Sequence, residues 1–338
     1  MTTENHGADI SNAPPTARPW LKWYEPGVPY SVTVPDRPLH RLLSDTAARC
    51  PNRNAILFMG RSMSFQELDD SVTRFANALI DLGVEPGDRV ALVMPNCPQM
   101  VISYYGTLRA GAVVVPTNPL YVESELEHQL NDAGVKVVVI LSMFYEKLQA
   151  VRSRIPSLEH VIVTNIGEYL PSLSKVLFRV AKERQEGHLV HLPDDGRTHW
   201  FQRLLEQSST NDPDITVSAD SVAILQYTSG TTGQPKGAML SHLALAIGAA
   251  QAHVWCVNVT RPDGADVVLG AIPLFHIYAQ TTVMNYPIAG GGTMILLPRF
   301  GLKDVLTAID HEKPDLFPGV PAMYVVINGA SSANRYNL

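Results

Sequence analysis

Residues 227–237 concentrate glycines, hydroxyl side chains and one lysine in a short loop, Tyr-Thr-Ser-Gly-Thr-Thr-Gly-Gln-Pro-Lys-Gly. Glycines let a backbone approach an anion closely, and successive N–H groups can form an anion-binding nest. Hydroxyls donate further hydrogen bonds, and Lys236 adds a positive point charge. This chemistry suits the phosphates of a nucleotide. The residues expected to bind them are Tyr227, Thr228, Ser229, Gly230, Thr231, Thr232, Gly233, Lys236 and Gly237.

This loop lies between two apolar stretches that indicate how it is anchored. Residues 222–226 form a short apolar run typical of a buried strand, and the apolar run from Ala238 onward predicts a helix. The expected order of strand, glycine-rich loop and helix is the layout of a phosphate cradle. The loop is not a Walker A motif, because Pro235 precedes the lysine and Gly237 follows it. A linker is the alternative, but dense hydroxyls and a lysine between apolar elements favour the phosphate site.

Two further segments carry residues that can act on a substrate. His276 lies just past an expected strand at residues 266–272, and open α/β sheets bind ligands at the carboxyl ends of their strands. A single histidine is more often structural than catalytic, so the residues alone leave both interpretations open. Residues 319–321, Gly-Val-Pro, predict by themselves only a turn and the start of a helix.

The glycine-rich loop resembles the signature loop of the adenylate-forming, or AMP-binding, superfamily, which includes acyl-CoA synthetases, luciferases and the adenylation domains of peptide synthetases. Residues 18–29 and 95–121 are similar to segments of fatty-acyl synthetases and of the superfamily, respectively. Residues 166–215 are similar to an insertion in bacterial long-chain fatty-acid CoA ligases. The resemblance implies ATP-dependent activation of a long-chain fatty acid to an acyl-adenylate and then to an acyl-CoA, with ATP, Mg²⁺ and CoA required.

The resemblance also implies a role for each candidate residue. In the family the loop holds the ATP phosphates while a carboxylate attacks the α-phosphate, which assigns catalytic roles to Thr228, Lys236 and His276. His276 would position the acyl carboxylate and stabilise charge. Mg²⁺ is implied because hard phosphate oxygens need a hard cation, and Thr228 is its expected protein ligand. The small and apolar residues at 319–324, with the glycines 290–292 nearby in sequence, suit an alkyl chain better than a charged amino acid. The residues expected to bind the substrate are His276, Ile277, Tyr278, Gly319, Val320 and Pro321.

The elements that must position these residues alternate between strands and helices. Apolar runs at residues 89–94, 112–115, 136–141 and 160–163 predict strands with helices between them, and residues 64–67 predict a capping box. Continuous β-branched runs of this kind indicate mostly parallel sheets covered by helices on both faces. The expected fold class is therefore α/β, with stacked sheets as in the large N-terminal domain of adenylate-forming enzymes.

The expected domain organisation follows from the resemblance. Residues 1–18 are expected to be mobile. Residues 19–338 are expected to form an incomplete N-terminal AMP-binding domain, divided into 19–165, an insertion at 166–215, and 216–338 with the phosphate loop. The adenine, ribose and catalytic-lysine motifs of the family are not found after Asn328, so the C-terminal domain is expected to be absent. We therefore expect a fragment that makes no acyl-CoA alone, and pyrophosphate release with ATP, CoA and palmitate would contradict this.

Bulk properties limit the partners and the compartment. The formal net charge of -6 over 338 residues argues against a nucleic-acid partner. Three cysteines, far apart in the chain, favour a cytoplasmic setting over a disulfide framework. Residues 173–184 have the pattern of a short basic amphipathic helix. It either rests on an anionic membrane surface, at the inner face of the membrane, or packs on the protein as an ordinary surface helix.

The sequence leaves alternatives to a fatty-acid ligase open. One is another acyl- or aryl-CoA ligase of the same superfamily, which a chain-length series of acids would distinguish. Another is a non-enzymatic ATP- or acyl-binding module, which would bind ATP without turnover. A conventional P-loop NTPase is disfavoured by Pro235. The oligomeric state is also open, with a homodimer as one alternative.

Overall fold

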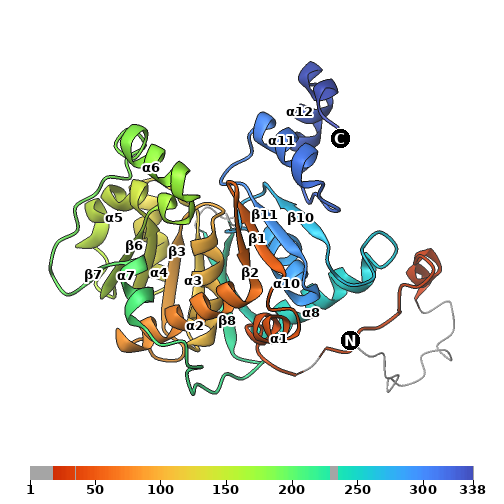
Figure 1. The fold of residues 1–338 in the computed structure, drawn as a ribbon. Helices are drawn as coiled ribbons and strands as arrows, with labels where there is room; N and C mark the ends of the chain where they lie inside the picture. Colours follow the sequence, from red (N-terminus) through yellow and green to blue (C-terminus); the bar gives the residue numbers. More distant parts are fainter. Residues whose placement is uncertain (1–17, 35, 229–234, 338) are drawn as a thin grey trace.

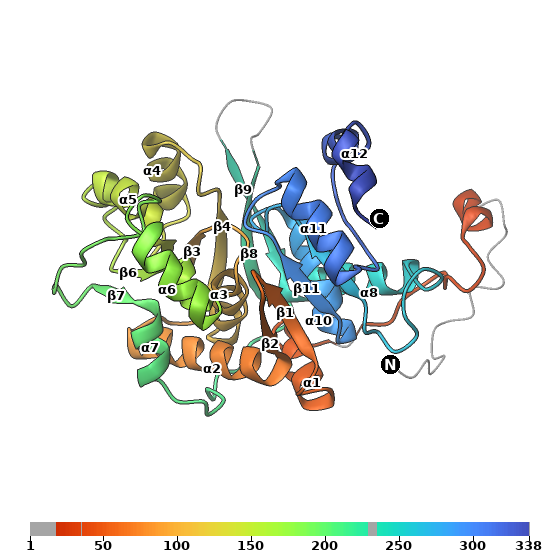
Figure 2. The ribbon, with the colours of Figure 1, turned by 45° about the horizontal axis from the view of Figure 1, so that its top comes forward.

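The structure, a computed structural model, describes residues 18–34, 36–228 and 235–337. The expected mobility of residues 1–18 falls, except for Arg18, on residues outside these ranges. Within the described ranges the chain forms a seven-stranded and a four-stranded sheet, with helices between and around them (Figure 1, Figure 2). The prediction of an α/β fold with mostly parallel sheets is therefore confirmed.

The larger sheet has the strand order β7-β6-β5-β3-β4-β8-β9. All neighbouring strands are parallel except β8 and β9, which pair antiparallel. The central strands β4 and β5 are buried at every residue, as continuous apolar runs predict. The strands are β3 (Arg89–Val93), β4 (Val113–Thr117), β5 (Val137–Leu141), β6 (His160–Thr164), β7 (Thr198–Trp200), β8 (Val222–Thr228) and β9 (Lys236–Ser241).

Helices cover both faces of the larger sheet. On one face, α4 and α5 pack on the strands in a core cluster of their own. On the other face, α3 lies in the main core, which also contains residues of α2 and of the smaller sheet. Ser64 and Glu67 form the predicted capping box at the start of α2. The bounds are α2 (Phe65–Asp81), α3 (Pro98–Arg109), α4 (Glu123–Asp132), η4 (Ser142–Phe144) and α5 (Tyr145–Arg152).

The smaller sheet has the order β10-β11-β1-β2, in which β10, β11 and β1 are parallel and β2 is antiparallel to β1. Its outer face is covered by α11 and by Ile327 of α12. The strands are β1 (Asn54–Phe58), β2 (Arg61–Ser64), β10 (Val267–Gly270) and β11 (Thr293–Leu296). The associated helical segments are η3 (Pro19–Trp23), α1 (Arg41–Arg49), α8 (His242–Trp255), α9 (Ile277–Ala279), the π-helical η6 (Gln280–Asn285), α10 (Tyr286–Gly290), α11 (Leu302–Glu312), α12 (Pro321–Asn328) and η7 (Ser331–Arg335).

The prediction that the apolar run from Ala238 onward is helical is wrong for its first residues. Ala238 lies within β9, which pairs with β8 along its whole length. Helix α8 begins only at His242, where the hydroxyl of Ser241 caps the backbone N–H of Ala244 at 3.2 Å. A short apolar run does not by itself distinguish a strand from a helix, and pairing with β8 decides the outcome here. The loop therefore connects two strands, and no helix N-terminus follows it directly.

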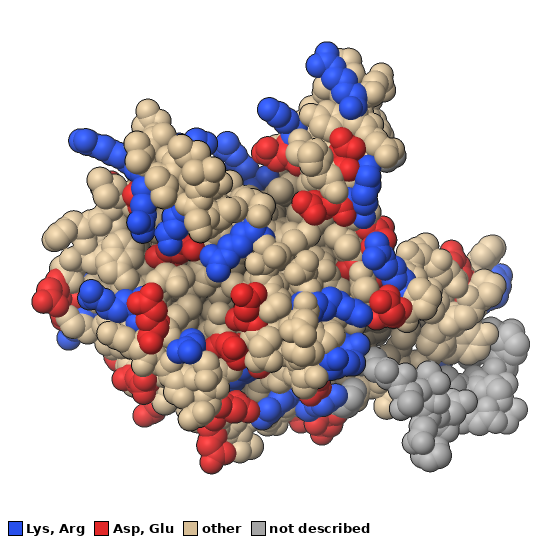
Figure 3. Space-filling model, viewed as in Figure 1, with Lys and Arg blue, Asp and Glu red and all other residues tan. Residues whose placement is uncertain are grey.

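Residues 166–215 contribute both to the larger sheet and to the surface. Strand β7 joins the sheet beside β6, and Phe201 of α7 packs against Phe75 of α2. Helix α6 lies at the surface, and the corresponding part of Figure 3, at the upper left, shows uncharged atoms bordered by basic side chains. The bounds are η5 (Ile166–Tyr169), α6 (Ser172–Ala181) and α7 (Phe201–Gln207).

The apolar stripe of α6 does not pack on the protein. All four of its members are exposed, and α6 packs on the protein through Phe178 instead. The stripe consists of Leu173, Val176, Leu177 and Val180. None of the helices in the described ranges has both the length and the apolar composition that a membrane crossing requires.

Candidate functional site

The β8–β9 hairpin brings the two ends of the glycine-rich loop together. Thr228, the last residue of β8, pairs in register with Lys236, the first residue of β9, and both are exposed. Directly opposed residues of an antiparallel pair have neighbouring side chains on one face. A hydroxyl and an ammonium group can therefore act together on one anion. The predicted contacts of Ser229, Gly230, Thr231, Thr232 and Gly233 lie outside the described residues.

Close to its glycine-rich loop, the β8–β9 hairpin is anchored to the end of helix α4. The Tyr227 hydroxyl donates a hydrogen bond to the carboxylate of Asp132 at 2.5 Å. Burial, and then the Asp132 carboxylate, raises the pKa of Tyr227, so the phenol stays a donor. Gly237 faces the Tyr227 ring, where a Cβ atom would come within 3.0 Å of Cε2. A larger residue at position 237 would therefore displace the Tyr227 ring.

Backbone hydrogen bonds fix the position of His276 on the loop that follows β10. Its N–H donates to the Pro273 carbonyl at 3.0 Å, and its carbonyl accepts from the Gln280 N–H at 3.1 Å. The imidazole packs on the Phe275 ring with centroids 4.4 Å apart. Partial burial lowers the pKa of His276, although the residue remains exposed overall. A neutral imidazole on a fixed backbone suits hydrogen bonding to a substrate better than a permanent ion pair.

A buried amide pair connects the phosphate hairpin with the His276 loop. Gln226, two residues before Thr228, donates to the Phe275 carbonyl at 3.0 Å. Its other amide atom accepts from Gln280 at 3.0 Å, and the Tyr104 hydroxyl of α3 lies 3.4 Å from Gln280 Oε1. Strand β8 and the histidine loop therefore keep one relative position. Sequence reasoning missed Gln226, and its only signal was an amide inside an apolar run, which burial obliges to find partners.

Asn96 plays a similar part on the other side of the loop. Its side chain is buried and donates to the carbonyls of Gly270 and Ile272, at 3.1 and 2.8 Å. Its amide oxygen accepts from the Leu274 N–H at 2.7 Å. One side chain therefore holds the chain from the end of β10 to the start of the histidine loop. The sequence showed Asn96 within a family-like segment, without indicating which backbone groups it would bind.

The third predicted segment lies at the start of α12. Val320 is the N-cap residue of this helix and Pro321 its first residue. The Tyr324 hydroxyl donates to the Phe317 carbonyl at 2.7 Å, across Gly319, where a Cβ atom would meet that hydroxyl at 2.9 Å. The pKa of Tyr324 is raised by burial and then by Tyr278, two residues after His276. The structure thus brings the second and third predicted segments near each other.

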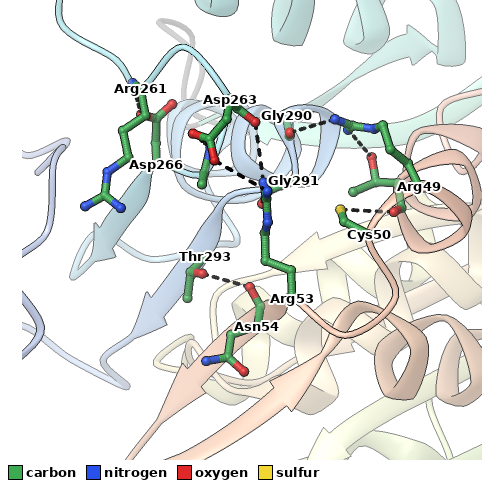
Figure 4. Close-up of polar contacts among 12 residues, drawn as sticks. Arg49, Cys50, Arg53, Asn54, Arg261, Asp263, Asp266, Gly290, Gly291 and Thr293 are labelled. Atoms are coloured by element: carbon green, nitrogen blue, oxygen red, sulfur yellow. Dashed lines mark hydrogen bonds and ion pairs between the residues drawn. The ribbon is translucent and has the colours of Figure 1, made fainter.

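Residues 290–292 lie at the opposite edge of the smaller sheet from His276. They connect α10 to the start of β11, whereas His276 follows the end of the parallel strand β10. Gly291 has a φ of +89°, which glycine adopts without strain. Figure 4 shows Arg49 donating to the Gly290 carbonyl at 3.2 Å and Arg53 to the Gly291 carbonyl at 3.1 Å. Turn geometry explains the glycine at position 291, which lies away from His276.

The donors available for Mg²⁺ are few. Among the described residues, no group of three or more His, Cys, Asp or Glu side chains could hold a metal ion. The predicted protein ligand is the exposed Thr228 hydroxyl at the end of β8. Mg²⁺ commonly keeps several waters and binds through substrate phosphates. A single hydroxyl at the hairpin therefore fits a cation that arrives with a nucleotide.

A parallel α/β scaffold that links a hydroxyl- and lysine-bearing hairpin to a histidine loop corresponds to the adenylate-forming class of proteins. The AMP-binding enzyme family matches residues 43–337, and this chain belongs to that family.

Relatives and solved structures agree with this class. A long-chain-fatty-acid–CoA ligase from Bacillus subtilis (strain 168) is 39% identical over 327 residues, covering 95% of this chain and 57% of the ligase. A long-chain-fatty-acid-CoA ligase structure from Archaeoglobus fulgidus has a TM-score of 0.74 at 26% identity, covering 90% of this chain and 56% of that one. An anthranilate CoA ligase in complex with anthranoyl-AMP has a TM-score of 0.76 at 23% identity, covering 91% and 54%, and shows the fold alone. The chain spans about half the length of these proteins.

Proposed function

We propose that this protein takes part in the ATP-dependent activation of a long-chain fatty acid, first to an acyl-adenylate and then to an acyl-CoA. The observation that carries the proposal is the Gln226 link between the phosphate hairpin and the His276 loop, in a chain of the AMP-binding family. The name of the Bacillus subtilis relative supports a fatty acid as the substrate class. ATP and the fatty acid would meet between this hairpin and this loop.

In the proposed reaction, a carboxylate oxygen of the fatty acid forms a bond to the α-phosphorus of ATP. The bond from that phosphorus to the bridging oxygen breaks, and pyrophosphate leaves. The CoA sulfur then bonds to the acyl carbon, AMP leaves, and the thiol proton passes to solvent. Both reactants of the first step are anions, so charge must be neutralised where they meet.

The hairpin residues would supply this neutralisation at the β- and γ-phosphates. Lys236 contributes a positive charge, and the loop contributes hydroxyls and backbone N–H groups from Tyr227 to Gly237. Mg²⁺, when bound with the nucleotide, adds positive charge at the phosphates, and Thr228 would provide its protein oxygen. The exposure of Thr228 and Lys236, side by side across the hairpin, supports these roles.

The His276 loop and the start of α12 would bind the acyl part. His276 would donate a hydrogen bond to the carboxylate or the adenylate and so position it, with the neutral ring favoured by its lowered pKa. Ile277 and Tyr278, together with residues 319–321, would line the acyl chain. The exposed side chains of Val320 and Tyr324 at the start of α12 support this role.

Equilibrium dialysis of ATP against the purified chain tests the hairpin assignment. We expect Lys236→Ala to weaken ATP binding about tenfold to a hundredfold, because a charge-assisted hydrogen bond is lost. Lys303→Ala, which removes an exposed lysine of α11, should leave ATP binding unchanged. Equal affinity in the Lys236→Ala variant and the wild type, or no ATP binding at all, would rule out the hairpin assignment.

The same assay separates the alternatives when carboxylic acids are added. Under the fatty-acid proposal, palmitate should increase ATP affinity more than short or aromatic acids do. A larger effect of an aromatic acid would favour an aryl-CoA ligase of the superfamily. ATP binding that no acid changes, without pyrophosphate release, would favour a non-enzymatic ATP-binding module.

We further propose that the protein is located in the cytoplasm. The cysteines Cys50, Cys97 and Cys256 are all free thiols, which supports a cytoplasmic protein. Residues 173–184 would contact the inner face of the membrane. A homodimer is the remaining partner proposal, and sedimentation velocity over a wide range of protein concentrations tests it.

A further inference from the structure

Helix α6 turns its apolar stripe away from the protein. Leu173, Val176, Leu177 and Val180 are 75%, 58%, 60% and 84% exposed. Their spacing places them on one face of the helix. The surface helix of a globular protein normally buries such a stripe against the core. Here the stripe forms an apolar ridge in solvent, which indicates that something outside the described chain covers it.

The orientation of α6 is fixed from its other side. Phe178 is the one buried residue of the helix and lies roughly opposite Val176 and Val180 on a helical wheel. Its ring packs against His188 with centroids 5.4 Å apart, and it fills the space beside Gly167 of η5. The following turn is held by Glu183, which accepts a hydrogen bond from Asn165 at 2.7 Å. A rotation of α6 that buried the stripe would remove Phe178 from this site. The exposure of the stripe is therefore a property of the folded chain.

Basic side chains border this ridge. Helix α6 contains Lys175 and Arg179 and no acidic residue, and Lys182 and Arg184 follow it. The nearby Glu183 and Glu186 are both engaged, with Asn165 and with Lys182 respectively. This local positive surplus contrasts with the formal net charge of -6 for the whole chain. The uncharged atoms bordered by basic ones at the upper left of Figure 3 show the same arrangement.

The turn between β1 and β2 extends the ridge. Gly60 approaches Pro171, the residue before α6, at 3.7 Å from its Cβ position. Next to it, Met59 is 55% exposed, and Arg61 donates to the Glu168 carbonyl and lies over the Tyr169 ring. The apolar side chain of Met59 and the positive charge of Arg61 therefore lie beside the start of α6, in addition to the residues of the helix itself.

We propose that α6 and the Met59 turn dock on an anionic lipid bilayer. The apolar side chains would enter the boundary between headgroups and acyl chains, and the Lys and Arg side chains would contact the anionic headgroups. A convex ridge of a few side chains matches a deformable lipid surface. It is small for a protein partner, because stable protein interfaces bury about 800 Å² on each side. The proposal is independent of the ligase assignment, because it needs neither ATP nor a fatty acid.

Sedimentation of the purified chain with vesicles tests this surface. We expect binding to phosphatidylglycerol-rich vesicles at low salt and little binding to pure phosphatidylcholine vesicles. Leu173→Gln/Val180→Gln should weaken binding about a hundredfold, because two side chains no longer enter the bilayer. Lys175→Gln/Arg179→Gln should weaken binding to anionic vesicles about thirtyfold.

A matched control uses exposed valines of another helix. Val325→Gln/Val326→Gln changes two exposed side chains of α12 and should leave vesicle binding within about a factor of two. The altered residues of α6 are exposed or half-buried, so every variant should remain folded by circular dichroism. The proposal is overturned by wild-type protein that ignores anionic vesicles, or by Leu173→Gln/Val180→Gln protein that binds them equally well. Self-association lost in that variant, without vesicle binding, would instead assign the ridge to a second copy of the chain.

Discussion

Helices α3 and α6 have similar lengths but opposite relations to the rest of the protein. All twelve residues of α3 are buried, whereas Phe178 alone is buried among the ten residues of α6. Several polar groups of α3 pair inside the protein, as Arg109 does with Asp69 and Tyr105 with Asn285, whereas the hydroxyls of Ser103 and Thr107 have no partner among the described residues. The site depends on this interior, because Tyr104 of α3 reaches the Gln280–Gln226 pair. The geometry of the site is therefore determined by buried polar pairs, whereas α6 is free to serve an external surface.

The largest expected effect follows from removing the buried charge of α3. The Arg109 side chain is 4% exposed and donates to the Asp69 carboxylate and to the hydroxyls of Thr73 and Ser44. Arg109→Met leaves Asp69 as a charge that is mostly buried and unpaired. We expect a loss of about 3 to 5 kcal/mol in the free energy of unfolding, measured by urea denaturation.

The corresponding change in α6 is the control for this prediction. Arg179 is exposed, so Arg179→Met should change the free energy of unfolding by less than about 0.5 kcal/mol. If Arg109→Met and Arg179→Met lowered the free energy of unfolding by similar amounts, the prediction would be contradicted. The buried Arg109–Asp69 pair would then stabilise the protein no more than an exposed charge does.

Glu168 connects the two regions, and its titration gives the next largest effect. Its carboxylate accepts from the Thr164 hydroxyl at 2.9 Å, and that hydroxyl accepts from Gln99 of α3 at 3.2 Å. Burial raises the pKa of Glu168 from 4.5 to about 7. Between these values the folded protein binds this proton more tightly than the unfolded chain does. Stability is therefore favoured at low pH and falls as pH rises through this window, by roughly 3 kcal/mol.

Urea denaturation at several pH values checks the sign and size of this effect. Glu168→Gln resembles the protonated carboxyl, so the variant should be more stable than the wild type above about pH 7 and similar to it near pH 4. The difference between the two proteins isolates Glu168 from the buried histidines His40 and His242, whose pKa values burial lowers to about 3 and about 4. Parallel stability curves for both proteins would contradict the raised pKa.

The buried interior around α3 was also the part of the fold that the sequence predicted well. The β-branched runs of β3, β4 and β5 and the capping box at the start of α2 were identified within a few residues of their observed bounds. Strong local patterns and tertiary packing agree in these elements. Strand β9 was missed because its apolar run also suits a helix, and only the pairing with β8 decides between them. The outward orientation of α6 was equally inaccessible, because a stripe does not reveal which side faces the core.

In the candidate site, too, some residues were predicted from the sequence and others were missed. The hairpin lysine, the hydroxyl beside it and His276 were identified from residue types and from a family resemblance, and their roles stay predictions. Gln226 and Asn96 were missed as organisers of the site. Their partners are 49 and 178 residues away in the chain, at Phe275 and Leu274. A sequence shows that a buried amide needs partners, but the fold decides which groups those partners are.

A substitution at Tyr105, in the buried interior around α3, should have a smaller effect on the free energy of unfolding. Its hydroxyl donates to Asn285 Oδ1 at 2.8 Å, and both residues are fully buried. Within the described residues, Asn285 Nδ2 already has no hydrogen-bond partner, so Tyr105→Phe leaves the whole amide unsatisfied. We expect a loss of about 1 to 3 kcal/mol in the free energy of unfolding. Tyr30→Phe, at an exposed tyrosine, should be nearly neutral, and an equal effect at both positions would weaken the contrast between interior and surface.

The smallest expected effect is at the most exposed residue of the ridge, near the end of α6. Val180 is 84% exposed, so it gains little burial on folding, and glutamine has at least as good a helix propensity as valine. Val180→Gln should therefore change the free energy of unfolding by less than about 0.5 kcal/mol in urea denaturation. A loss above about 1 kcal/mol would show that the stripe packs against the protein in solution. Retained stability together with weaker binding to anionic vesicles would separate a surface role of α6 from a folding role, because the same side chain would then matter only when lipid is present.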